Sequence, residues 1–346
     1  MKRILALFLV LVLILSFSLT GCRTEEEGVK TYRIGVALYQ FSDNFMAMMR
    51  GDMEDYIEEL TTDTTKFDVT VVDGKNDMIT QSNQIDTFIA QGMDCIILAL
   101  VQTSAADVII DRVVKAHIPL VLINREPLGD DGDESYSRIL NNKNVSYVGA
   151  DARQSGTYQG EMVVEAENHG DLNHDGVVSY VMIEGDPENP DAQYRTEYSI
   201  NAIKDAGVKV KCLDDQIGMW DTAKGQEIAA NALAKYGEDI EVILCNNDAM
   251  ALGASAAIEA AGREVNKDIL LYGVDGLPEV IEKIKKGDMT GTVFNDHISQ
   301  MRAAIDAAID MVNGKTVDKY IWKDYLKITN KDIDEIYDYL QGGGTK

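Results

Sequence analysis

The chain has 346 residues, of which 45% are hydrophobic, so it is long enough to form two domains that each bury a core. Its 58 acidic and 32 basic residues give a formal net charge of −26 at pH 7. A charge of this sign and size repels nucleic acids and anionic lipid surfaces alike, which excludes a nucleic-acid partner and indicates a soluble body.

The N-terminus reads as a secretion signal. Two basic residues precede an apolar run over residues 4–19, which is short for a membrane span. The run ends in Leu-Thr-Gly-Cys, a pattern that resembles a bacterial lipobox, so we expect residues 1–21 to be a lipoprotein signal peptide and Cys22 to carry lipid. Residues 22–31 would then form a tether. A plain signal peptide with an incidental cysteine is the alternative.

The rest of the chain alternates short β-branched runs with longer segments of helical apolar spacing. The runs that read as strands are Arg33–Tyr39, Phe67–Asp73, Asp94–Leu100, Pro119–Ile123, Val145–Gly149, Val178–Ile183, Val208–Leu213, Ile240–Cys245, Ile269–Val274 and Met289–Phe294. Helical spacing occurs, for example, in Asn44–Leu60, Gln154–Asn168, Thr222–Tyr236 and Ala249–Ala261. This alternation predicts an α/β fold with helices on both faces of parallel sheets. We expect two doubly wound lobes, the first four strands in one and the next six in the other.

Three cysteines lie in this region, Cys95, Cys212 and Cys245. Each is in or beside an apolar run, and none has the C-x-x-C spacing of a redox or zinc site. We expect buried thiols that act as small hydrophobic groups, and no disulfide.

One stretch between the predicted strands has the pattern of a calcium loop. Asp171, Asn173 and Asp175 alternate, Gly follows, and Val177 and Ser179 continue the spacing. In an EF-hand, oxygen ligands stand at positions 1, 3, 5, 7 and 9, and Gly at position 6 permits the turn. The closing Glu at position 12 is missing, because Met182 stands there. A solvated turn rich in Asp and Asn is the alternative.

Polar and aromatic side chains follow many of the predicted strands. In open α/β sheets, ligands bind beyond the carboxyl ends of the strands. The residues at these ends include Asp43, Phe45, Asp191, Arg195, Trp220, Asn247, Asp275 and Asn295. Side chains that donate and accept in pairs suit adjacent sugar hydroxyls, and aromatic rings suit the C–H faces of a pyranose. Each Asp or Asn has a structural alternative as a helix N-cap.

Six segments together resemble the D-galactose/D-glucose-binding proteins of bacterial ABC sugar importers, which have the type I periplasmic binding protein fold. The segments are Tyr32–Phe45 (YRIGVALYQFSDNF), Asn189–Thr196 (NPDAQYRT), Met219–Ala223 (MWDTA), Asn246–Ala251 (NNDAMA), Gly273–Glu279 (GVDGLPE) and Gly291–Asp296 (GTVFND). The similarity runs from about Tyr32 to Lys315, and only the C-terminal tail beyond it is loose.

The resemblance implies a monosaccharide site made of the strand-end residues named above, together with Asn189. Phe45 and Trp220 would cover the two faces of the sugar ring, and Arg195 would donate to its ring and anomeric oxygens. The chain departs from the family at Asn189, where the family has His, and at Ala99, where the family has Asn. Both departures remove polar contacts to the part of the sugar where the family holds the exocyclic hydroxymethyl group.

The resemblance also implies a structural calcium ion in the Asp171–Ser179 loop. A distant Glu closes the site in the family, and it matches Glu241 here, which supplies the ligand that position 12 lacks. The family has Gln as the ninth ligand, whereas this chain has the shorter Ser179, which is expected to need a water to reach the ion.

The implied architecture is two lobes joined by a three-segment hinge. The crossings would fall near His117–Pro119, Asn295–His297 and Tyr325. The N-terminal lobe would comprise residues 32–118 and 297–325, and the C-terminal lobe residues 119–296 and 326–346. Sugar would bind in the cleft, and an ABC permease would recognise the closed, loaded form. The protein is expected to be a monomer, anchored by Cys22 at the outer face of the cytoplasmic membrane.

A glycoside-active enzyme and a chemosensory sugar receptor are the alternatives on this fold. A glycosidase needs paired carboxylates, one of them with a raised pKa. Here Asp43, Asp191 and Asp275 have Asn and Arg neighbours, which favours a binding protein over an enzyme. Neither G-x-G-x-x-G nor a P-loop occurs, so no nucleotide site is predicted.

Overall fold

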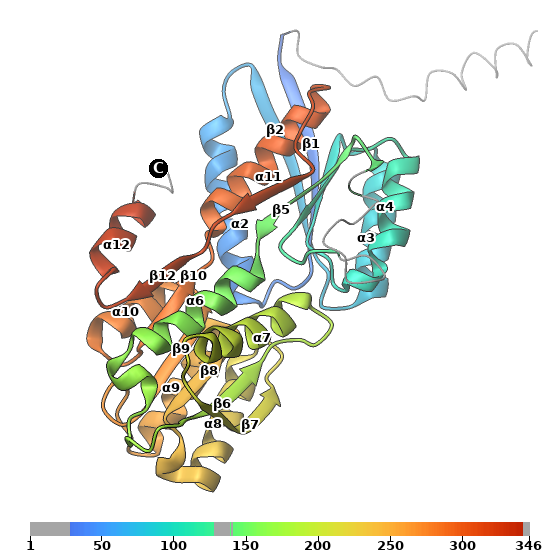
Figure 1. The fold of residues 1–346 in the computed structure, drawn as a ribbon. Coiled ribbons are helices and arrows are strands. Elements are labelled where there is room, and N and C mark those ends of the chain that lie inside the picture. Colours follow the sequence, from blue (N-terminus) through green and yellow to red (C-terminus); the bar gives the residue numbers. More distant parts are fainter. Residues whose placement is uncertain (1–27, 128–138, 140, 342–346) are drawn as a thin grey trace, which may run out of the picture.

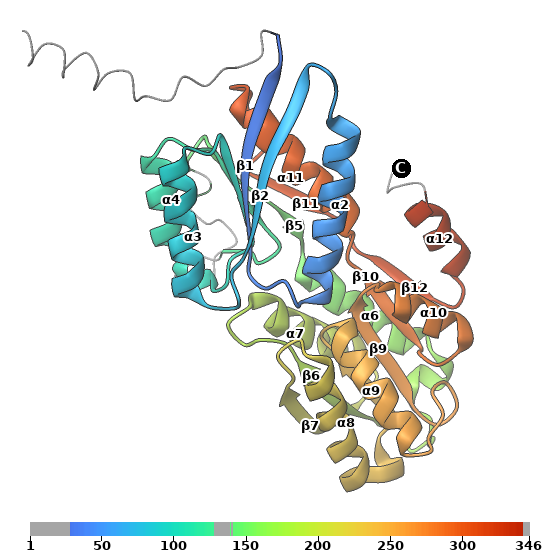
Figure 2. The same ribbon diagram turned by 180° about the vertical axis from the view of Figure 1, so that it is seen from behind.

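The computed structural model describes residues 28–127, 139 and 141–341. Within this part of the chain, strands form two six-stranded sheets, and helices cover both faces of each (Figure 1). The two lobes lie one above the other, and the view from behind shows the same arrangement (Figure 2). The prediction of two doubly wound lobes is therefore confirmed. The signal peptide, Cys22 and most of the expected tether lie outside the described residues.

The sheet of the first lobe has the strand order β11-β5-β4-β3-β1-β2, and all of its neighbours are parallel. Its strands are β1 (Lys30–Leu38), β2 (Thr65–Asp73), β3 (Cys95–Leu98), β4 (Leu120–Ile123), β5 (Val145–Ala150) and β11 (Tyr320–Lys323). The central strands β3 and β4 are buried at every position, as expected for strands that are covered on both faces.

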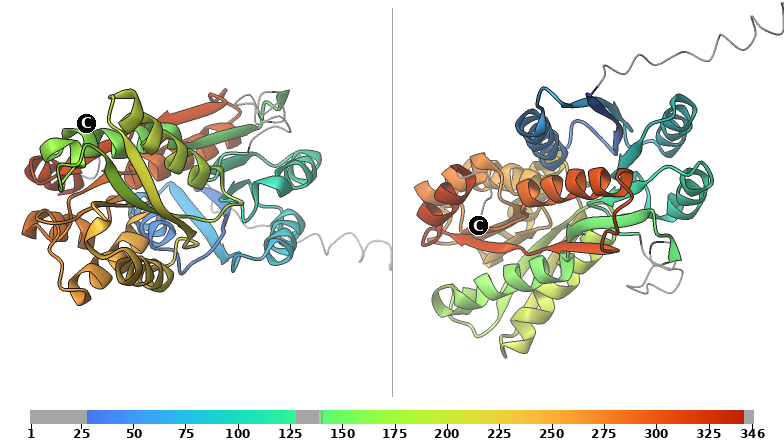
Figure 3. Two further views of the ribbon diagram at one scale, coloured as in Figure 1. Left: turned by 60° about the horizontal axis from the view of Figure 1, so that its bottom comes forward. Right: turned by 90° about the horizontal axis from the view of Figure 1, so that it is seen from above.

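Two layers of helices enclose this sheet. Apolar side chains of α2 (Asn44–Leu60) and α11 (His297–Val312) pack on one face, and those of α3 (Met78–Gln91) and α4 (Ala106–Lys115) pack on the other. The short 3-10 helix η1 (Thr103–Ala105) precedes α4. Seen from above, α11 runs alongside the strand segment that contains β11 (Figure 3).

The sheet of the second lobe has the order β12-β10-β9-β8-β6-β7. Its strands are β6 (Val178–Glu184), β7 (Val210–Ile217), β8 (Val242–Cys245), β9 (Leu270–Asp275), β10 (Gly291–Phe294) and β12 (Leu326–Thr329). Only β12 is antiparallel to its neighbour among the described strands. The two sheets therefore share one plan, in which a late C-terminal strand closes the edge of each.

Helices also cover both faces of the second sheet. α6 (Ala152–Glu165) and α7 (Pro190–Asp205) lie on one face, and α8 (Thr222–Tyr236), α9 (Asp248–Ala260), α10 (Pro278–Lys286) and α12 (Ile333–Gln341) lie on the other. Two 3-10 helices complete the lobe, η2 (Glu167–Gly170) and η3 (Gly237–Asp239). None of the described helices is long and apolar enough to cross a membrane.

The close packing of α6 on α7 depends on glycine. A Cβ on Gly160 would lie 2.2 Å from the backbone oxygen of Ser199, so a larger residue would push the two helices apart. Because α7 carries Arg195, this contact also fixes the height of that side chain above the sheet.

The first crossing between the lobes lies later than predicted. β4 pairs with β3 and β5 in the first sheet, with Leu120 opposite Val145, so this sheet takes five consecutive strands instead of four. The division after residue 118, with a crossing near His117–Pro119, is therefore wrong, and the chain passes to the second lobe after Ala150. The grouping of the first four strands places β4 in the first lobe, as observed, whereas the crossing implied by the resemblance does not. β5 was assigned to the second lobe, because a buried parallel strand is a similar apolar run whichever sheet it joins.

The other two crossings fall where the resemblance implied. β10 ends at Phe294 in the second sheet, and α11, which begins at His297, packs on the first. β11 and β12 are joined by a short segment that contains the buried Tyr325. These two crossings run close to each other and form most of the hinge.

Two of the three cysteines are buried as predicted. Cys95 and Cys245 lie in central strands, and their burial raises the pKa of both thiols. Cys212 is exposed, which corrects the prediction for that residue, because β7 is an edge strand with one open side.

Candidate functional site

A hollow between the lobes is lined by residues that follow strands of both sheets. The first lobe contributes Tyr39, Asp43, Phe45 and Asn124, and the second contributes Asn189, Asp191, Arg195, Trp220, Asn247 and Asp275. The structure thus brings eight of the nine predicted sugar-site residues around one hollow. Tyr39 and Asn124 were not predicted, because Tyr39 reads as the end of a core strand and Asn124 as a turn residue.

Arg195 connects most of the polar groups of the hollow. Its Nη1 donates to the backbone oxygen of Asn246 at 2.8 Å and lies 3.8 Å from Oδ1 of Asp275. Its Nη2 donates to Oδ2 of Asp191 at 3.4 Å and to the hydroxyl of Tyr325 at 3.3 Å. The guanidinium carbon is 5.7 Å from the ring centroid of Trp220. The guanidinium therefore joins strand ends of the second sheet to the hinge.

The start of α7 explains why Asp191 and Arg195 meet. Asn189 caps the helix, since its Oδ1 accepts from the backbone N–H of Asp191 at 3.1 Å, and Pro190 occupies the first turn. Asp191 and Arg195 are then four residues apart on one helical face. Both are buried, so the pair is held away from solvent.

Burial dominates the electrostatics of this group. It raises the pKa of Asp191 and Asp275, while the positive charge of Arg195 acts in the opposite direction on both carboxyls. Burial alone would lower the pKa of Arg195, but Tyr325 and the two carboxyls outweigh it and raise that pKa. Among the described residues, Nε of Arg195 has no hydrogen-bond partner, so one buried donor is left over.

The loop that carries Asp275 is held by Asp248, a residue that was not predicted. Oδ2 of Asp248 accepts from the backbone N–H groups of Gly276 and Leu277 at 2.7 and 2.8 Å, and Oδ1 accepts from the Thr292 hydroxyl at 2.6 Å. Asp275 itself has a φ of 131°, a strained value for a residue with a side chain. Burial raises the pKa of Asp248 to about 6. We infer that Asp248 keeps Asp275 in this conformation.

The Trp220 ring lies close to Gly185. A Cβ on Gly185 would lie 2.0 Å from the Trp220 ring, so only glycine lets the indole occupy this place. Met219 and Trp220 both have positive φ values, 55° and 63°. This strained turn after β7 aims the aromatic ring into the hollow, where it is available to stack on a ligand.

Some of the polar residues that line the hollow are also helix N-caps, as the structural alternative for Asp and Asn predicted. Asp43 caps α2, and Asn247 caps α9, each through one side-chain oxygen. Both residues line the hollow as well. Capping and ligand binding therefore do not exclude each other here, because a cap uses only part of the hydrogen-bonding capacity of each side chain.

Asn295 lies behind the hollow instead of lining it. Its Oδ1 accepts from Nε2 of Gln300 at 2.6 Å, and it hydrogen-bonds the carboxyl of Asp275. In the structure it therefore supports Asp275. Ala99, which replaces the family's Asn, is fully buried, and its backbone oxygen accepts from Nε2 of Gln81 at 2.8 Å.

The predicted calcium loop is folded around its own carboxylates. Asp171 accepts from the backbone N–H groups of Asp175 and Gly176 at 3.2 and 2.9 Å. Glu241 is buried next to the loop, and its two oxygens accept from the N–H groups of Asn173 and Ser179 at 3.1 and 2.7 Å. The oxygen donors are the type that Ca²⁺ takes. Within the described residues, however, no three acidic, His or Cys side chains converge as a metal cluster.

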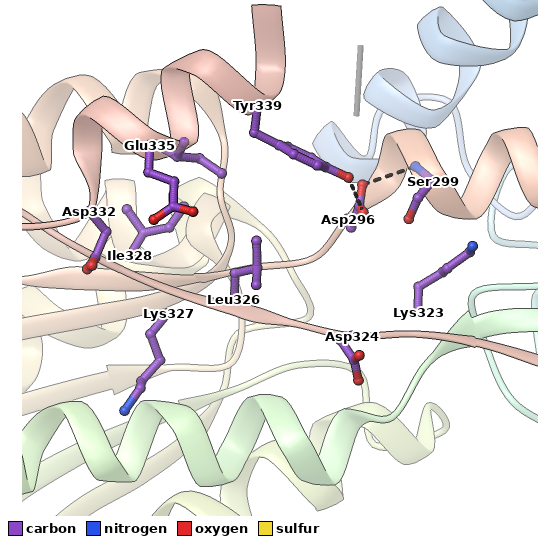
Figure 4. A pocket seen from close by; sticks show the side chains of 11 residues that line it. Asp296, Ser299, Lys323, Asp324, Leu326, Lys327, Ile328, Asp332, Glu335 and Tyr339 are labelled. Atoms are coloured by element: carbon purple, nitrogen blue, oxygen red, sulfur yellow. Dashed lines mark hydrogen bonds between the residues drawn. The ribbon is translucent and has the colours of Figure 1, made fainter. Parts of the chain in front are cut away.

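A larger hollow lies on the outer side of the hinge, away from the strand ends (Figure 4). It is lined by residues of β12, α12 and the two close crossings, among them Lys323, Leu326 and Tyr339. The Tyr339 hydroxyl donates to Asp296, which also caps α11. Within the described part of the chain, Tyr339 is the only aromatic residue in this lining, whereas Tyr39, Phe45, Trp220 and the buried Arg195 line the inner hollow. We therefore take the inner hollow as the functional site.

Comparison with known proteins identifies the family of the chain. The profile of the periplasmic binding protein domain family matches residues 34–316. The chain is 33% identical over 319 residues to the D-galactose/methyl-galactoside binding periplasmic protein MglB of Haemophilus influenzae, a match that covers 89% of this chain and 92% of that protein. It is 30% identical over 303 residues to a putative rhizopine-binding protein of Rhizobium meliloti, covering 87% and 91%.

Solved structures show the same fold. An ABC transporter solute binding protein from Bacillus halodurans with bound myo-inositol aligns with a TM-score of 0.75 and 26% identity, covering 91% of this chain and 99% of that one. A galactofuranose binding protein aligns with a TM-score of 0.78, covering 91% and 100%, but at 21% identity this similarity concerns the fold alone.

Proposed function

This chain belongs to the periplasmic binding protein family, and from this premise we propose that it captures a hexose, galactose or glucose, and delivers it to an ABC permease. It is a sugar-binding protein of the ABC-transporter type, which acts outside the cytoplasm. Its relatives are substrate-binding proteins and not enzymes, so the glycosidase alternative is not favoured. The choice of hexose is our proposal, since solved relatives carry other polyols and sugars.

The observation that carries the proposal is the buried group around Arg195 beneath Trp220. Asp191 and Asp275 are both within 4 Å of the guanidinium, and all three side chains line the hollow. Carboxylates that are fixed by an Arg still have lone pairs for hydroxyl donors, and the Arg has a donor left for an acetal oxygen. This mixture suits a neutral polyol with adjacent hydroxyls.

The first lobe completes the site. Phe45 is buried at the start of α2, and Asp43 comes just before it. A pyranose between Phe45 and Trp220 would have an aromatic ring on each face, while Asp43 would accept from a hydroxyl at the ring edge. Because the two aromatics belong to different lobes, a bound sugar would stabilise the closed arrangement.

A thermal-shift screen of hexoses and pentoses tests this function. A ligand that binds only the folded chain raises the unfolding midpoint by mass action. We expect galactose and glucose to raise it and a nucleotide to leave it unchanged. A folded protein whose midpoint responds to no monosaccharide would contradict the proposal.

We further propose that the Asp171–Ser179 loop binds a structural Ca²⁺. The sequence pattern, the oxygen donors and the buried Glu241 beside the loop support it. Asp171, Asn173, Asp175 and Glu241 would bind through side chains, Val177 through its backbone oxygen, and Ser179 through water. The ion would offset the mutual repulsion of the three carboxylates in the set and tie the loop to the start of β8.

We also propose that lipid on Cys22 holds the protein at the outer face of the cytoplasmic membrane. The Leu-Thr-Gly-Cys pattern after the apolar run supports it. The connection from Cys22 to the body would be short, since β1 begins at Lys30. A monomeric body near the membrane would meet its permease by diffusion over a small distance. A role in presenting sugar to a chemoreceptor is the second candidate on the same fold.

A further inference from the structure

A second chamber adjoins the sugar hollow on the side away from the hinge. It is lined in the first lobe by the β1–α2 loop, by Asn76 after β2 and by Arg125 after β4, and in the second lobe by Asp186 and the β7–α8 turn. β2 and β7 are the sheet edges opposite β11 and β12, which hold the hinge. The chamber therefore lies toward the open side of the cleft.

The chamber and the sugar hollow are continuous. Tyr39, Asp43 and Trp220 line both of them. The cavity volume of the chamber is about 140 Å³, against about 20 Å³ for the hollow. Small-molecule pockets have volumes of about 300–1,000 Å³, so the chamber would hold one part of a ligand whose other part lies in the hollow. A ligand in the hollow that carries a substituent toward the cleft opening would place it in the chamber.

The side chain of Arg125 is buried and lines the chamber. Its side chain is 1% exposed, its guanidinium carbon lies 3.9 Å from the ring centroid of Tyr39, and its Nη1 is 3.6 Å from Oδ2 of Asp186 in the other lobe. Nη1 also donates to the backbone oxygen of Val101. Its Nε and Nη2 have no hydrogen-bond partner among the described residues. Buried donors of this kind are normally satisfied, and a ligand with oxygen acceptors would satisfy them.

The charges of the lining indicate which ligands fit. The described residues of the lining include three carboxylates, those of Asp43, Asp186 and Asp221, and one guanidinium, that of Arg125. The net negative charge of the lining would repel a carboxylate or phosphate substituent. Hydroxyl groups, in contrast, can donate to the carboxylates and accept from Arg125. The chamber therefore suits a neutral, hydroxylated group.

We propose that this chamber is a second subsite, and that the protein binds glycosides whose second sugar ring lies against Arg125 and Asp186. The inference rests on the proposed function, because the first ring must occupy the sugar hollow. The second ring would lie between the lobes and contact both of them, so closure would be stabilised by the whole ligand and not by one ring alone.

Titration calorimetry with a panel of disaccharides tests the subsite. Lactose, melibiose, maltose and gentiobiose join two pyranoses through different hydroxyls, and galactose and glucose are the one-ring references. We expect at least one disaccharide to bind as tightly as the monosaccharides. Arg125→Met should weaken that disaccharide roughly ten- to hundredfold, as expected for hydrogen bonds to a charged group, and weaken the monosaccharides less than about threefold.

Two further variants make the outcome decisive. Thr222→Trp fills the chamber from an exposed position and should abolish disaccharide binding alone. Arg112→Met removes a first-lobe arginine that pairs with Asp86 on α3, away from both hollows, and should change neither ligand. Monosaccharide binding without any disaccharide binding would overturn the subsite and leave the proposed function standing. Equal losses for both ligands in Arg125→Met, or tighter binding of galacturonate than of any disaccharide, would also overturn it. If neither class of sugar binds, the proposed function fails as well.

Discussion

Asn189 serves the fold and the site with one side chain. Its Oδ1 caps α7, and the residue lines the sugar hollow at the same time. The His that the family has at this position would offer a ring nitrogen to the ligand. At position 99, the Ala side chain is a buried methyl group beside the same strand ends, so it offers no polar atom. At position 189 the ring nitrogen is thus replaced by an amide that is used in the cap, and at position 99 a polar side chain is replaced by a methyl group.

We predict that the Ala99→Asn, Asn189→His double variant discriminates hexoses from pentoses more sharply than the wild type. Hydrogen bonds to the exocyclic hydroxymethyl group stabilise a bound hexose but not a bound pentose, which lacks this group. The net contribution of one such bond to the free energy of binding is about 0.5–1.5 kcal/mol. The wild type should therefore reject a pentopyranose such as xylose less strongly than the double variant does. Calorimetry of glucose, galactose and xylose on both proteins measures this. Equal discrimination would mean that Gln102 or water already supplies the lost contacts.

Most residues that line the hollow could be predicted from the sequence, but the residues that hold them in place could not. Asp43, Asp191, Arg195 and Trp220 stand out because polar or aromatic residues directly follow apolar strands. Asp248 did not stand out, since its role depends on Thr292 and on backbone groups more than 25 residues away. Partners of this kind follow from tertiary structure and have no local sequence signal.

The β9–α10 connection is the element whose conformation most affects the site. It carries the strained Asp275 and is held by the buried Asp248. Because burial raises the pKa of Asp248 to about 6 from 3.8, the folded chain holds this proton at pH values where the unfolded chain has released it. The contribution of Asp248 to stability is therefore fully present below about pH 3.8 and is lost as the pH rises to about 6.

We predict that Asp248→Asn removes this pH dependence. The amide keeps an oxygen for the two backbone donors and does not titrate. With about 1.4 kcal/mol per pKa unit, the free energy of unfolding of the wild type should fall relative to the variant by roughly 2–3 kcal/mol between pH 4 and pH 7. Urea unfolding of both proteins across this range is the measurement. A difference that is the same at every pH would contradict the assignment.

A second element-level prediction concerns the Asp171–Ser179 loop. If Ca²⁺ ties this loop to Glu241, chelation should lower the unfolding midpoint, because the three carboxylates then repel one another without a cation. Melting curves in excess EDTA and in excess Ca²⁺ compare the two states. Glu241→Gln should melt at the same temperature in both, and the order of preference among sugars should not change. Identical melting curves of the wild type in the two solutions would contradict the calcium proposal.

At the element level, strong periodic patterns were predictive and weak ones were not. The long amphipathic helices and buried strands match their predicted positions closely, for example α2 (Asn44–Leu60). β11 and β12 were missed, because each has four residues and is largely half-exposed or exposed, so neither forms an apolar run. They are strands because they close the sheet edges after the chain has crossed the hinge.

At the scale of the molecule, the late first crossing changes how the hinge is understood. β4 and β5 belong to the first lobe, so Asn124 and Arg125 are first-lobe groups that face the second lobe across the cleft. Arg195 contacts Tyr325 in the third crossing, which connects the sugar hollow to the hinge. We therefore expect occupation of the hollow to bias the angle between the lobes through Arg195 and Tyr325.

We predict that Cys22→Ser separates the body from the membrane. Lipid attachment needs the thiol, so the variant should stay unprocessed or be released, whereas the wild type should sediment with the membrane. Fractionation with mass spectrometry of both proteins distinguishes these states. Recovery of both in the same fraction, with masses that differ only by the substitution, would rule out lipidation at this residue.

Titration calorimetry measures whether one sugar binds between the lobes against Trp220. We predict saturable binding of one galactose or glucose per chain. Trp220→Ala should weaken both sugars by a similar factor, since a flat ring contributes stacking of about 0.5–1.5 kcal/mol but does not distinguish epimers. A folded wild type that gives no binding heat with either hexose would show that this site is not a hexose site, and a Trp220→Ala variant that binds both as tightly as the wild type would show that Trp220 does not stack on the sugar.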